Sequence, residues 1–422
     1  MTWAPVRLRR LISSAVGGIW GEDAGVGEID VPCVRAADFN YSQLVIDSRN
    51  IPMRSVLAAQ LRSKRLRKGD LIIEKSGGGE RQPVGRVVRW DLDGQAVCSN
   101  FAARIRPAVG VLDRFLVYLL DSLYSAGITT KSIKQTTGIQ NLDLTSYFDE
   151  IVLVPSFSGQ HAIADFLDVE TARIDALIAK KRCLIEKLQE RFLGLVRQSV
   201  CSVPNPNDPL DIRPLDVAGQ PVTPSRLVWR FRLGSGTTPR SDNGRYYAST
   251  GIPWVVTGDL RDGYIDRVDR SVTKEALADH SALVLHNAGS VVVAMYGATI
   301  GRLARMRISA TVNQACCVIS KAGENLPDFV FYWLLGFRRE LIDRGRGAGQ
   351  PNISQEMLKA IRVALPPPHT QRSIVDMLDS ERAKVEGLVV LLNRQVALLQ
   401  ERRQVLIAAA VTEKMEIPGV SK

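Results

Sequence analysis

The stretch that decides the fold occurs twice in this chain, as QHAIADFLDVETARIDALI at residues 160–178 and as QRSIVDMLDSERAKVEGLV at residues 371–389. The two copies align without a gap at a constant offset of 211 positions. Further along, Leu188-Gln-Glu-Arg191 matches Leu399-Gln-Glu-Arg402 at the same offset. A register kept over this length indicates an internal duplication.

Both repeats, taken as residues 160–200 and 371–411, show the apolar periodicity of a long helix. Apolar side chains recur at steps of three and four residues, from Ile163 onward in the first repeat and from Ile374 onward in the second. About 40 residues at 1.5 Å each span about 60 Å, which is more than a compact domain covers. The pattern therefore predicts two long helices that pair as an antiparallel coiled coil. The alternative is that each helix folds back on its own globular segment.

Short apolar runs bounded by Gly, Asp and Pro fill much of residues 1–136 and are typical of strands. The sequence predicts strands at 30–34, 70–74 and 84–88, a loop at 76–83 and a helix at 112–120. The same order returns with looser similarity in residues 202–347. A strand-like run that contains Pro precedes each long helix, at Ile151–Pro155 and Ile361–Pro368.

The duplication thus covers nearly the whole chain and predicts an α+β protein with pseudo-two-fold internal symmetry. Two α/β globular domains are expected, separated by the two long helices. The predicted segments are 1–136, 137–201, 202–347 and 348–422, with a linker at Ser202–Leu210.

The net charge of +11 lies in the two globular segments. Residues 1–136 hold 20 Lys and Arg against 13 Asp and Glu, and residues 201–347 hold 18 against 14. The helical segments are close to neutral, with 7 against 9 in 137–200 and 10 against 8 in 348–422. A polyanionic partner would therefore meet the globular segments, and the alternative is a general solubilising charge.

Motifs of catalysis and of metal binding are not found. The chain has no methyltransferase loop of the D/N/S-P-P-aromatic kind, no P-loop and no acidic-x-Lys spacing of a nuclease. The six cysteines lie at irregular spacings, which predicts buried thiols rather than disulfides or metal ligands. We expect a non-catalytic protein without a cofactor. Because no signal peptide and no apolar run of about 18 residues occur, we also expect a cytoplasmic protein.

These features together resemble the specificity subunit of type I restriction-modification systems. The resemblance rests on the start of each helix, where the pattern Pro-x-x-x-x-Gln-x-x-Ile-x-x-x-Leu-Asp places Pro155, Gln160, Ile163 and Asp168, and Pro366, Gln371, Ile374 and Asp379. Further marks are Leu399–Ile407, Ala409–Lys414, Gly236–Pro239, Tyr296–Gly301, Asn313–Gln314 and Gly349–Ser354. The first globular segment departs from these marks, since Gly18-Ile-Trp-Gly stands where the second has Gly236-Thr-Thr-Pro.

The resemblance implies that the globular segments are target-recognition domains for double-stranded DNA. The target would be bipartite, with a spacer whose length the helices set. Two methyltransferase (modification) subunits would dock on the helices, and motor-nuclease (restriction) subunits would join through the complex. A coiled-coil protein-interaction scaffold without sequence-specific DNA binding is the alternative, and a self-sufficient nuclease is a third hypothesis.

Basic and polar residues in glycine-rich segments are the candidates for DNA contact, because they can reach phosphates and Arg can also read guanine. In the first domain they are Lys75 and Arg81 beside the loop of Gly77–Gly79, and Lys131, Lys134 and Gln135 in a turn predicted at Ile128–Gly138. In the second domain they are Thr238, Arg240, Thr299, Arg302, Arg344, Arg346 and Gln350. The candidates for partner docking are Leu188, Glu190, Arg191, Leu399, Glu401 and Arg402. For these six residues, pairing of the two helices is an equally open role.

Overall fold

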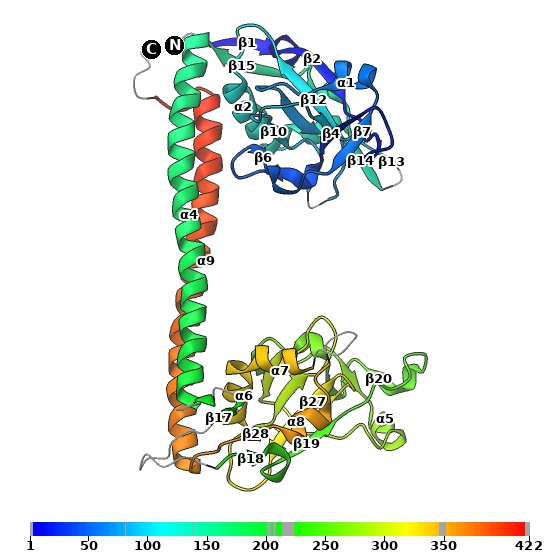
Figure 1. Cartoon of the computed structure of the whole chain (residues 1–422), viewed down its shortest axis with the longest axis vertical. Helices are drawn as coiled ribbons and strands as arrows, with labels where there is room; N and C mark the ends of the chain where they lie inside the picture. The colour runs from blue at the N-terminus through cyan, green and yellow to red at the C-terminus, as the bar shows by residue number, and fades with distance from the viewer. Residues whose placement is uncertain are drawn as a thin grey trace. The chain divides into compact units, whose positions relative to one another are not determined.

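The computed structural model describes residues 3–80, 82–136, 138–200, 204–205, 208–212, 223–345 and 352–417. The chain forms two compact units. Unit 1 consists of residues 1–183 and 392–422, and unit 2 of residues 184–391. Each unit contains one globular domain and a part of each long helix (Figure 1). The division into four segments made from the sequence stays a prediction.

The two long helices are α4 (Phe157–Val200) and α9 (Pro368–Val411), each of 44 residues. Both begin three residues before the predicted starts and end at the predicted residues, so the prediction of two long helices is confirmed. No helix within the described residues is long and apolar enough to cross a membrane.

In unit 1 the two helices pack against each other in antiparallel directions. Ile163, near the start of α4, shares a buried cluster with Ile407 near the end of α9. Further along α4, Ile174 and Ile178 share a cluster with Val396, which comes earlier in α9. Larger residue numbers in α4 therefore face smaller ones in α9, as an antiparallel pair requires.

In unit 2 the last part of α4 packs against the first part of α9. Val196 and Val200 share one buried cluster with Val375 and Leu378. This cluster also holds core residues of the second globular domain. Each long helix therefore packs against both the other long helix and a globular domain. Helix pairing and packing on a globular segment, which the sequence left as alternatives, occur together.

The globular domain of unit 1 contains β1–β15 and α1–α3. The elements are β1 (Trp3–Arg7), β2 (Ile12–Gly17), β3 (Glu22–Asp23), β4 (Ile29–Val34), β5 (Phe39–Asn40), β6 (Val45–Ile46), β7 (Met53–Val56), α1 (Ala58–Lys64), β8 (Leu71–Glu74), β9 (Ser76–Gly77), β10 (Val87–Arg89), β11 (Val97–Cys98), β12 (Ala102–Pro107), α2 (Asp113–Ser125), β13 (Ile133–Thr136), β14 (Ile139–Leu142), α3 (Leu144–Tyr147) and β15 (Ile151–Pro155).

The described part of unit 2 outside the long helices contains β16–β28 and α5–α8. The elements are β16 (Pro204–Asn205), β17 (Asp208–Ile212), β18 (Ser225–Arg226), β19 (Phe231–Ser235), β20 (Tyr247–Ala248), β21 (Ile252–Val255), β22 (Gly263–Ile265), β23 (Ser271–Val272), α5 (Lys274–Asp279), β24 (Val291–Ala294), β25 (Leu303–Met306), β26 (Thr311–Val312), β27 (Cys316–Lys321), α6 (Pro327–Gly336), α7 (Arg338–Arg344), α8 (Gln355–Ala360) and β28 (Arg362–Val363).

The two globular domains share one sheet topology. The main sheet has the order β2-β12-β8-β10-β6-β5 in unit 1 and β19-β27-β24-β25-β22 in unit 2. In both, the pair β10·β6 or β25·β22 is parallel and the preceding pairs are antiparallel. The four-stranded sheets β11-β4-β7-β3 and β26-β21-β23-β20 correspond in the same way. The internal duplication predicted from the sequence is thus confirmed in the fold.

Unit 1 also contains a three-stranded sheet, in the order β13-β14-β9. Its strand β13 lies where the sequence predicted a turn at Ile128–Gly138, and that prediction was wrong. Residues Ile128–Ser132 form a 3-10 helix, and β13 then pairs with β14 in an antiparallel hairpin. A run of polar residues gave no apolar alternation from which this hairpin could be predicted.

The cysteine prediction is confirmed for the globular domains and wrong for α4. The buried and unpaired cysteines are Cys33, Cys98, Cys316 and Cys317. Cys183 is exposed, because a helix that packs on one side leaves its other faces in water. Cys201 lies outside the described residues.

Candidate DNA interface and its supports

The glutamine that opens each repeat joins the long helix to its globular domain. Gln160 accepts a hydrogen bond from the backbone N–H of Leu112 at 2.9 Å, and its Nε2 donates to the carbonyl of Pro155 at 3.3 Å. Gln371 accepts one from Leu326 at 2.9 Å and likewise donates to a proline carbonyl five residues before it, at 2.7 Å. Both glutamines are buried. They therefore satisfy the backbone N–H groups just before α2 and α6.

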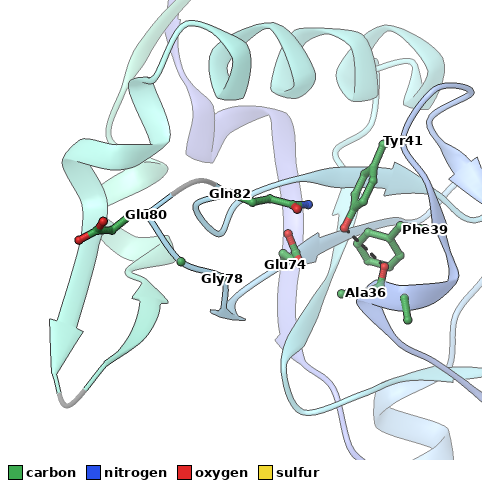
Figure 2. A pocket seen from close by; sticks show the side chains of 9 residues that line it. Ala36, Phe39, Tyr41, Glu74, Gly78, Glu80 and Gln82 are labelled. Carbon is green, nitrogen blue, oxygen red and sulfur yellow. Dashed lines mark hydrogen bonds between the residues drawn. The ribbon is translucent and has the colours of Figure 1, made fainter. Parts of the chain in front are cut away.

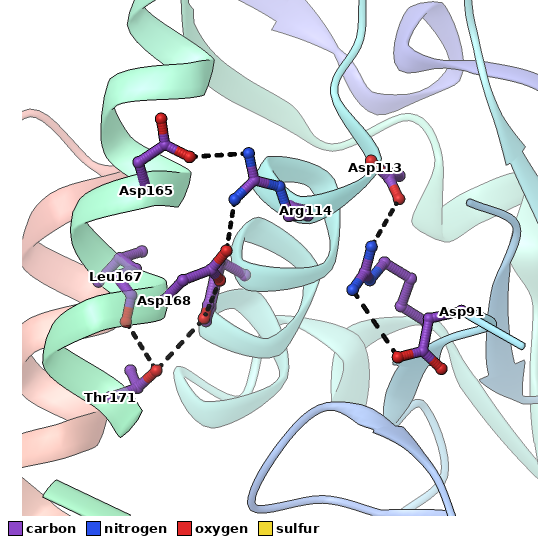
Figure 3. A network of polar contacts seen from close by, with 9 residues as sticks. Asp91, Asp113, Arg114, Asp165, Leu167, Asp168 and Thr171 are labelled. Atoms are coloured by element: carbon purple, nitrogen blue, oxygen red, sulfur yellow. Dashed lines mark hydrogen bonds and ion pairs between the residues drawn. The ribbon is translucent and has the colours of Figure 1, made fainter. Parts of the chain in front are cut away.

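The aspartate of the Leu-Asp motif forms the second contact. In unit 1, Asp168 accepts a hydrogen bond from the Tyr118 hydroxyl at 2.8 Å. Arg114 forms ion pairs with Asp165 at 2.8 Å and with Asp168 at 2.5 Å, as Figure 3 shows. Arg114 and Tyr118 of α2 thus contact two aspartates, one turn apart, on α4. The glutamine and the Leu-Asp pair at the start of each repeat therefore dock the long helix on its globular domain.

Unit 2 repeats the contact with a more deeply buried arginine. Asp379 of α9 accepts a hydrogen bond from Tyr332 and forms an ion pair with Arg305 at 2.7 Å. The Arg305 side chain is only 3% exposed, and the Tyr264 ring centroid lies 4.0 Å from its guanidinium. Burial opposes ionisation of Asp379, but the hydrogen bonds from Arg305, Tyr332 and Tyr264 and the charge of Arg305 together outweigh it, so that the pKa of this carboxyl is lowered from 3.8. Each domain is therefore held firmly to its helix.

In the first globular domain, the fold brings together two of the predicted DNA-binding segments. Strand β9, which follows Lys75, pairs with β14, and the N–H of Leu142 donates to the carbonyl of Lys75 at 2.8 Å. Lys134 and Gln135 lie exposed on β13 of the same small sheet, and Lys131 is exposed just before it. The Lys75 side chain is half-buried.

Two details qualify this group. Lys134 already forms an ion pair with Asp143 at 2.6 Å, but the lysine side chain is 74% exposed. Such an exposed pair is weak and can exchange for a phosphate. Arg81 lies outside the described residues.

In the second globular domain, the loop after β19 meets the Asn-Gln motif. The hydroxyl of Thr238 donates to the side-chain oxygen of Gln314. Arg240 is exposed and forms a long ion pair with Asp242 at 3.5 Å. The structure thus brings together two loops that are more than 70 positions apart.

Another pair of candidate segments also meets in this domain. Tyr296 forms an isolated β-bridge with Asn352, and the N–H of Ile353 donates to the Met295 carbonyl at 2.8 Å. The loop that follows contains the half-buried Thr299 and the exposed Arg302. Arg344 is exposed at the end of α7, and Arg346 and Gln350 lie outside the described residues.

Gly18 follows β2 in the first domain, and Gly236 follows β19 in the second. Each glycine allows its loop to lie directly against the backbone of another segment. A Cβ on Gly236 would lie 1.7 Å from the Val312 carbonyl oxygen, and one on Gly18 would lie 2.1 Å from that of Ser99. No other residue fits at either place. The first domain therefore keeps the role of this glycine, although its Gly-Ile-Trp-Gly sequence differs from Gly-Thr-Thr-Pro.

The first globular domain also holds a cavity of about 760 Å³ that the sequence did not indicate. Phe39 and Tyr41 line it together with Glu74, Gly78 and Gln82 (Figure 2). Glu74 was recognised only as the end of a strand. Its burial depends on a loop more than 30 positions away, and no local pattern reports such a contact.

The candidate docking residues on the helices divide into two kinds. Leu399 packs against the buried cluster of α4 and α9 and so contributes to helix pairing. Leu188 is half-buried, while the charged candidates Glu190, Arg191, Glu401 and Arg402 are exposed.

Leucine and valine side chains that the sequence analysis missed are more exposed than these leucines. Leu391, Leu398 and Val405 of α9 are 56%, 55% and 62% exposed. They recur every seven residues and hence lie along one stripe of the helix. The seven-residue spacing is the signal from which they could have been found.

Comparison with known proteins agrees with this geometry. Residues 231–386 match the family model described as "Type I restriction modification DNA specificity domain". The type I restriction enzyme EcoR124I/EcoR124II specificity subunit of Escherichia coli is 24% identical over 173 residues, which are 40% of this chain and 42% of that subunit. The match thus spans less than half of the relative's length.

Two solved structures resemble the chain in fold. A chain of the structure described as the structural basis underlying complex assembly and conformational transition of the type I R-M system has a TM-score of 0.75 at 17% identity, over 98% of both chains. The crystal structure of the HsdS subunit from Thermoanaerobacter tengcongensis has a TM-score of 0.52 at 17% identity, over 98% of this chain and 97% of the other.

Proposed function

We propose that this chain is a specificity subunit of a type I restriction-modification system and that it selects the DNA target of a methyltransferase. The match of residues 231–386 to a type I DNA specificity domain and the similarity in fold to a chain of a type I R-M structure support this proposal. The target is a bipartite duplex sequence. Each globular domain reads one part, and the two long helices set the length of the non-specific spacer between them.

One observation carries this proposal: the same sheet topology and the same helix-docking contacts occur in both units. Two similar domains in one chain suit a target with two separate specific parts. The firm attachment of each domain to its helices supports a role of the helices in spacing, because a flexible attachment would not select one spacer length.

The placement of charge supports duplex DNA as the ligand. The Lys and Arg excess lies in the globular segments, and exposed basic residues such as Lys131, Arg240 and Arg302 lie in or next to their loops. Phosphate contacts by such residues release counterions and make affinity fall steeply with salt. Base-specific contacts then select the sequence.

The methyltransferase subunits dock on the helical regions in this proposal, one on each unit, and a motor-nuclease subunit joins through the complex. Exposed Leu398 and Val405 in unit 1 support an apolar contribution to this docking, since neighbouring exposed apolar side chains are typical of an interface. The chain itself is proposed to be non-catalytic, so the purified chain alone is expected neither to methylate nor to cleave DNA.

Duplex binding by the assembled methyltransferase complex, measured at a series of salt concentrations, tests the proposal. We expect an affinity for duplexes with the target sequence that falls linearly with the logarithm of salt concentration. Affinity that is absent or insensitive to salt would contradict DNA recognition and favour the protein-interaction scaffold instead.

A further inference from the structure

The cavity of the first globular domain contains a carboxylate at a place where a DNA-binding surface would not be expected to hold one. Ala36, Phe39 and Tyr41 line it on one side, and Gly78, Glu80 and Gln82 line it on the other (Figure 2). No Lys or Arg is among the described residues that line it.

Glu74, the last residue of β8, provides that carboxylate. It is 9% exposed, and within the described part of the chain it forms no ion pair. Burial raises the pKa of this carboxyl, while the nearby Arg86 and Tyr41 side chains lower it. Figure 2 shows Glu74 and Gln82 directed toward Tyr41, whereas Glu80 points away. A buried carboxylate that faces a cavity can accept hydrogen bonds from a ligand there.

The aromatic wall of the cavity is held in place from behind. The guanidinium of Arg86 lies 3.9 Å from the centroid of the Tyr41 ring, and the Phe39 ring meets Tyr41 edge-on with centroids 5.7 Å apart. Such packing fixes the ring before a ligand arrives. A rigid aromatic wall beside one acceptor suits a flat ligand with an amino group.

The cavity also adjoins the predicted DNA-binding surface. The glycine-rich loop that forms one wall follows β9, and β9 pairs with the hairpin that carries Lys134 and Gln135. Gly78 has a φ of +61°, and a Cβ there would lie 2.9 Å from the Val84 nitrogen. The backbone at Gly78 therefore lies so close to Val84 that a side chain would not fit there.

We propose that this cavity reads one base of the DNA target, with the Glu74 carboxylate accepting a hydrogen bond from the exocyclic amino group of cytosine or adenine. This inference rests on the proposed function. In the major groove these amino groups are the donors that the bases offer, and glutamate is a suitable acceptor for them. A basic side chain of a partner protein is the competing occupant.

The test is methylome sequencing of a host that expresses the Glu74→Gln chain with its cognate modification subunits. Loss of the acceptor is expected to weaken the preference for one C·G or A·T pair by about tenfold, in one part of the target only. The identity of the relaxed base pair distinguishes cytosine from adenine. Glu22→Gln is the matched control. Glu22 is exposed on β3, and its substitution causes the same change in charge away from the cavity.

Glu74→Asp provides a second variant that keeps the charge and withdraws the carboxylate by one methylene group. It is expected to weaken the preference at the same base pair, and thermal unfolding of both variants reports whether they fold. An unchanged methylated sequence in both variants, with methylation retained, would overturn the base-reading role. So would the loss of a modification subunit from the purified Glu74→Gln complex, which would indicate a basic protein side chain as the occupant.

These outcomes leave the proposed function separately testable. If the wild-type complex binds duplex DNA without salt dependence, the proposed function fails. If it binds as expected and only the base preference is unaffected, the inference about Glu74 alone fails.

Discussion

At the scale of single residues, the duplicated aspartates Asp168 and Asp379 allow a matched comparison. Asp379 is the nearer ion-pair partner of Arg305, whose side chain is 3% exposed, whereas the side chain of Arg114, the partner of Asp168, is 28% exposed. Asp379→Asn is expected to lower the free energy of unfolding by about 1.5–3 kcal/mol, because it removes the nearer of the two carboxylates that pair with a buried guanidinium and leaves only Asp328 at 3.7 Å. Asp168→Asn is expected to cost less. Equal losses in denaturant unfolding would contradict this account.

The contribution of Asp379 also depends on pH. Its pKa in the folded chain is lowered from 3.8, because the hydrogen bonds from Arg305 and two tyrosines, together with the charge of Arg305, outweigh burial. A lowered carboxyl pKa stabilises the folded state above the unfolded value, and this stability is lost as the pH falls through the folded value. The difference between the wild type and Asp379→Asn is therefore expected at pH 7 and should narrow below about pH 4. Unfolding measured across that range checks it.

Asp121 of α2 is expected to show the opposite dependence of stability on pH. Burial raises the pKa of this carboxyl from 3.8 to about 6, so folding favours its protonated form. The folded state is accordingly less stable once the pH has risen from 3.8 to about 6. At about 1.4 kcal/mol per pKa unit, this shift in pKa corresponds to a loss of about 3 kcal/mol in the free energy of unfolding. Asp121→Asn is expected to stabilise unit 1 at pH 7 by up to that amount. A destabilised variant at pH 7 would show that the attraction to Arg403 outweighs burial.

At the scale of elements, two adjacent leucines of α9 separate docking from helix pairing. Leu398 is 55% exposed, while Leu399 packs in the cluster between α4 and α9. Leu398→Glu is expected to weaken binding of the modification subunit at least tenfold and to leave the thermal midpoint unchanged. Leu399→Glu is expected to lower the midpoint, because it places a charge in the helix interface. Titration calorimetry and thermal unfolding distinguish the two, and unchanged binding by Leu398→Glu would rule out this stripe.

Regular periodicity made the long elements predictable. The apolar stripes of 160–200 and 371–411 predicted α4 and α9 within three residues at their starts, and the strand before α4 was predicted at its observed bounds, Ile151–Pro155. The hairpin of β13 and β14 was missed because its residues do not alternate between apolar and polar.

The parts of the candidate site that depend on distant contacts were less predictable. Lys75 and Lys134 were chosen for charge and loop composition, and the sequence held no indication that β9 and β14 bring their segments together. Glu74 was missed because its burial comes from packing against a loop distant in the chain. Local sequence patterns predict helices and strands, whereas this candidate site depends on contacts between segments that are distant in the chain.

At the scale of the whole molecule, the central claim is that two recognition domains read two parts of one target and that the helices set the spacer. A seven-residue insertion preserves the apolar stripe of a paired helix and lengthens it by about 10 Å, or about three base pairs of DNA. The insertion is made in both α4 and α9, within 177–191 and 388–402, so that the helices stay matched.

Long-read methylome mapping of hosts that express the wild-type or the inserted chain with its cognate methyltransferase tests this claim most directly. The account predicts that both specific parts of the methylated sequence stay the same, while the spacer between them grows by up to about three base pairs. An inserted chain that still directs methylation with the original spacer would contradict it.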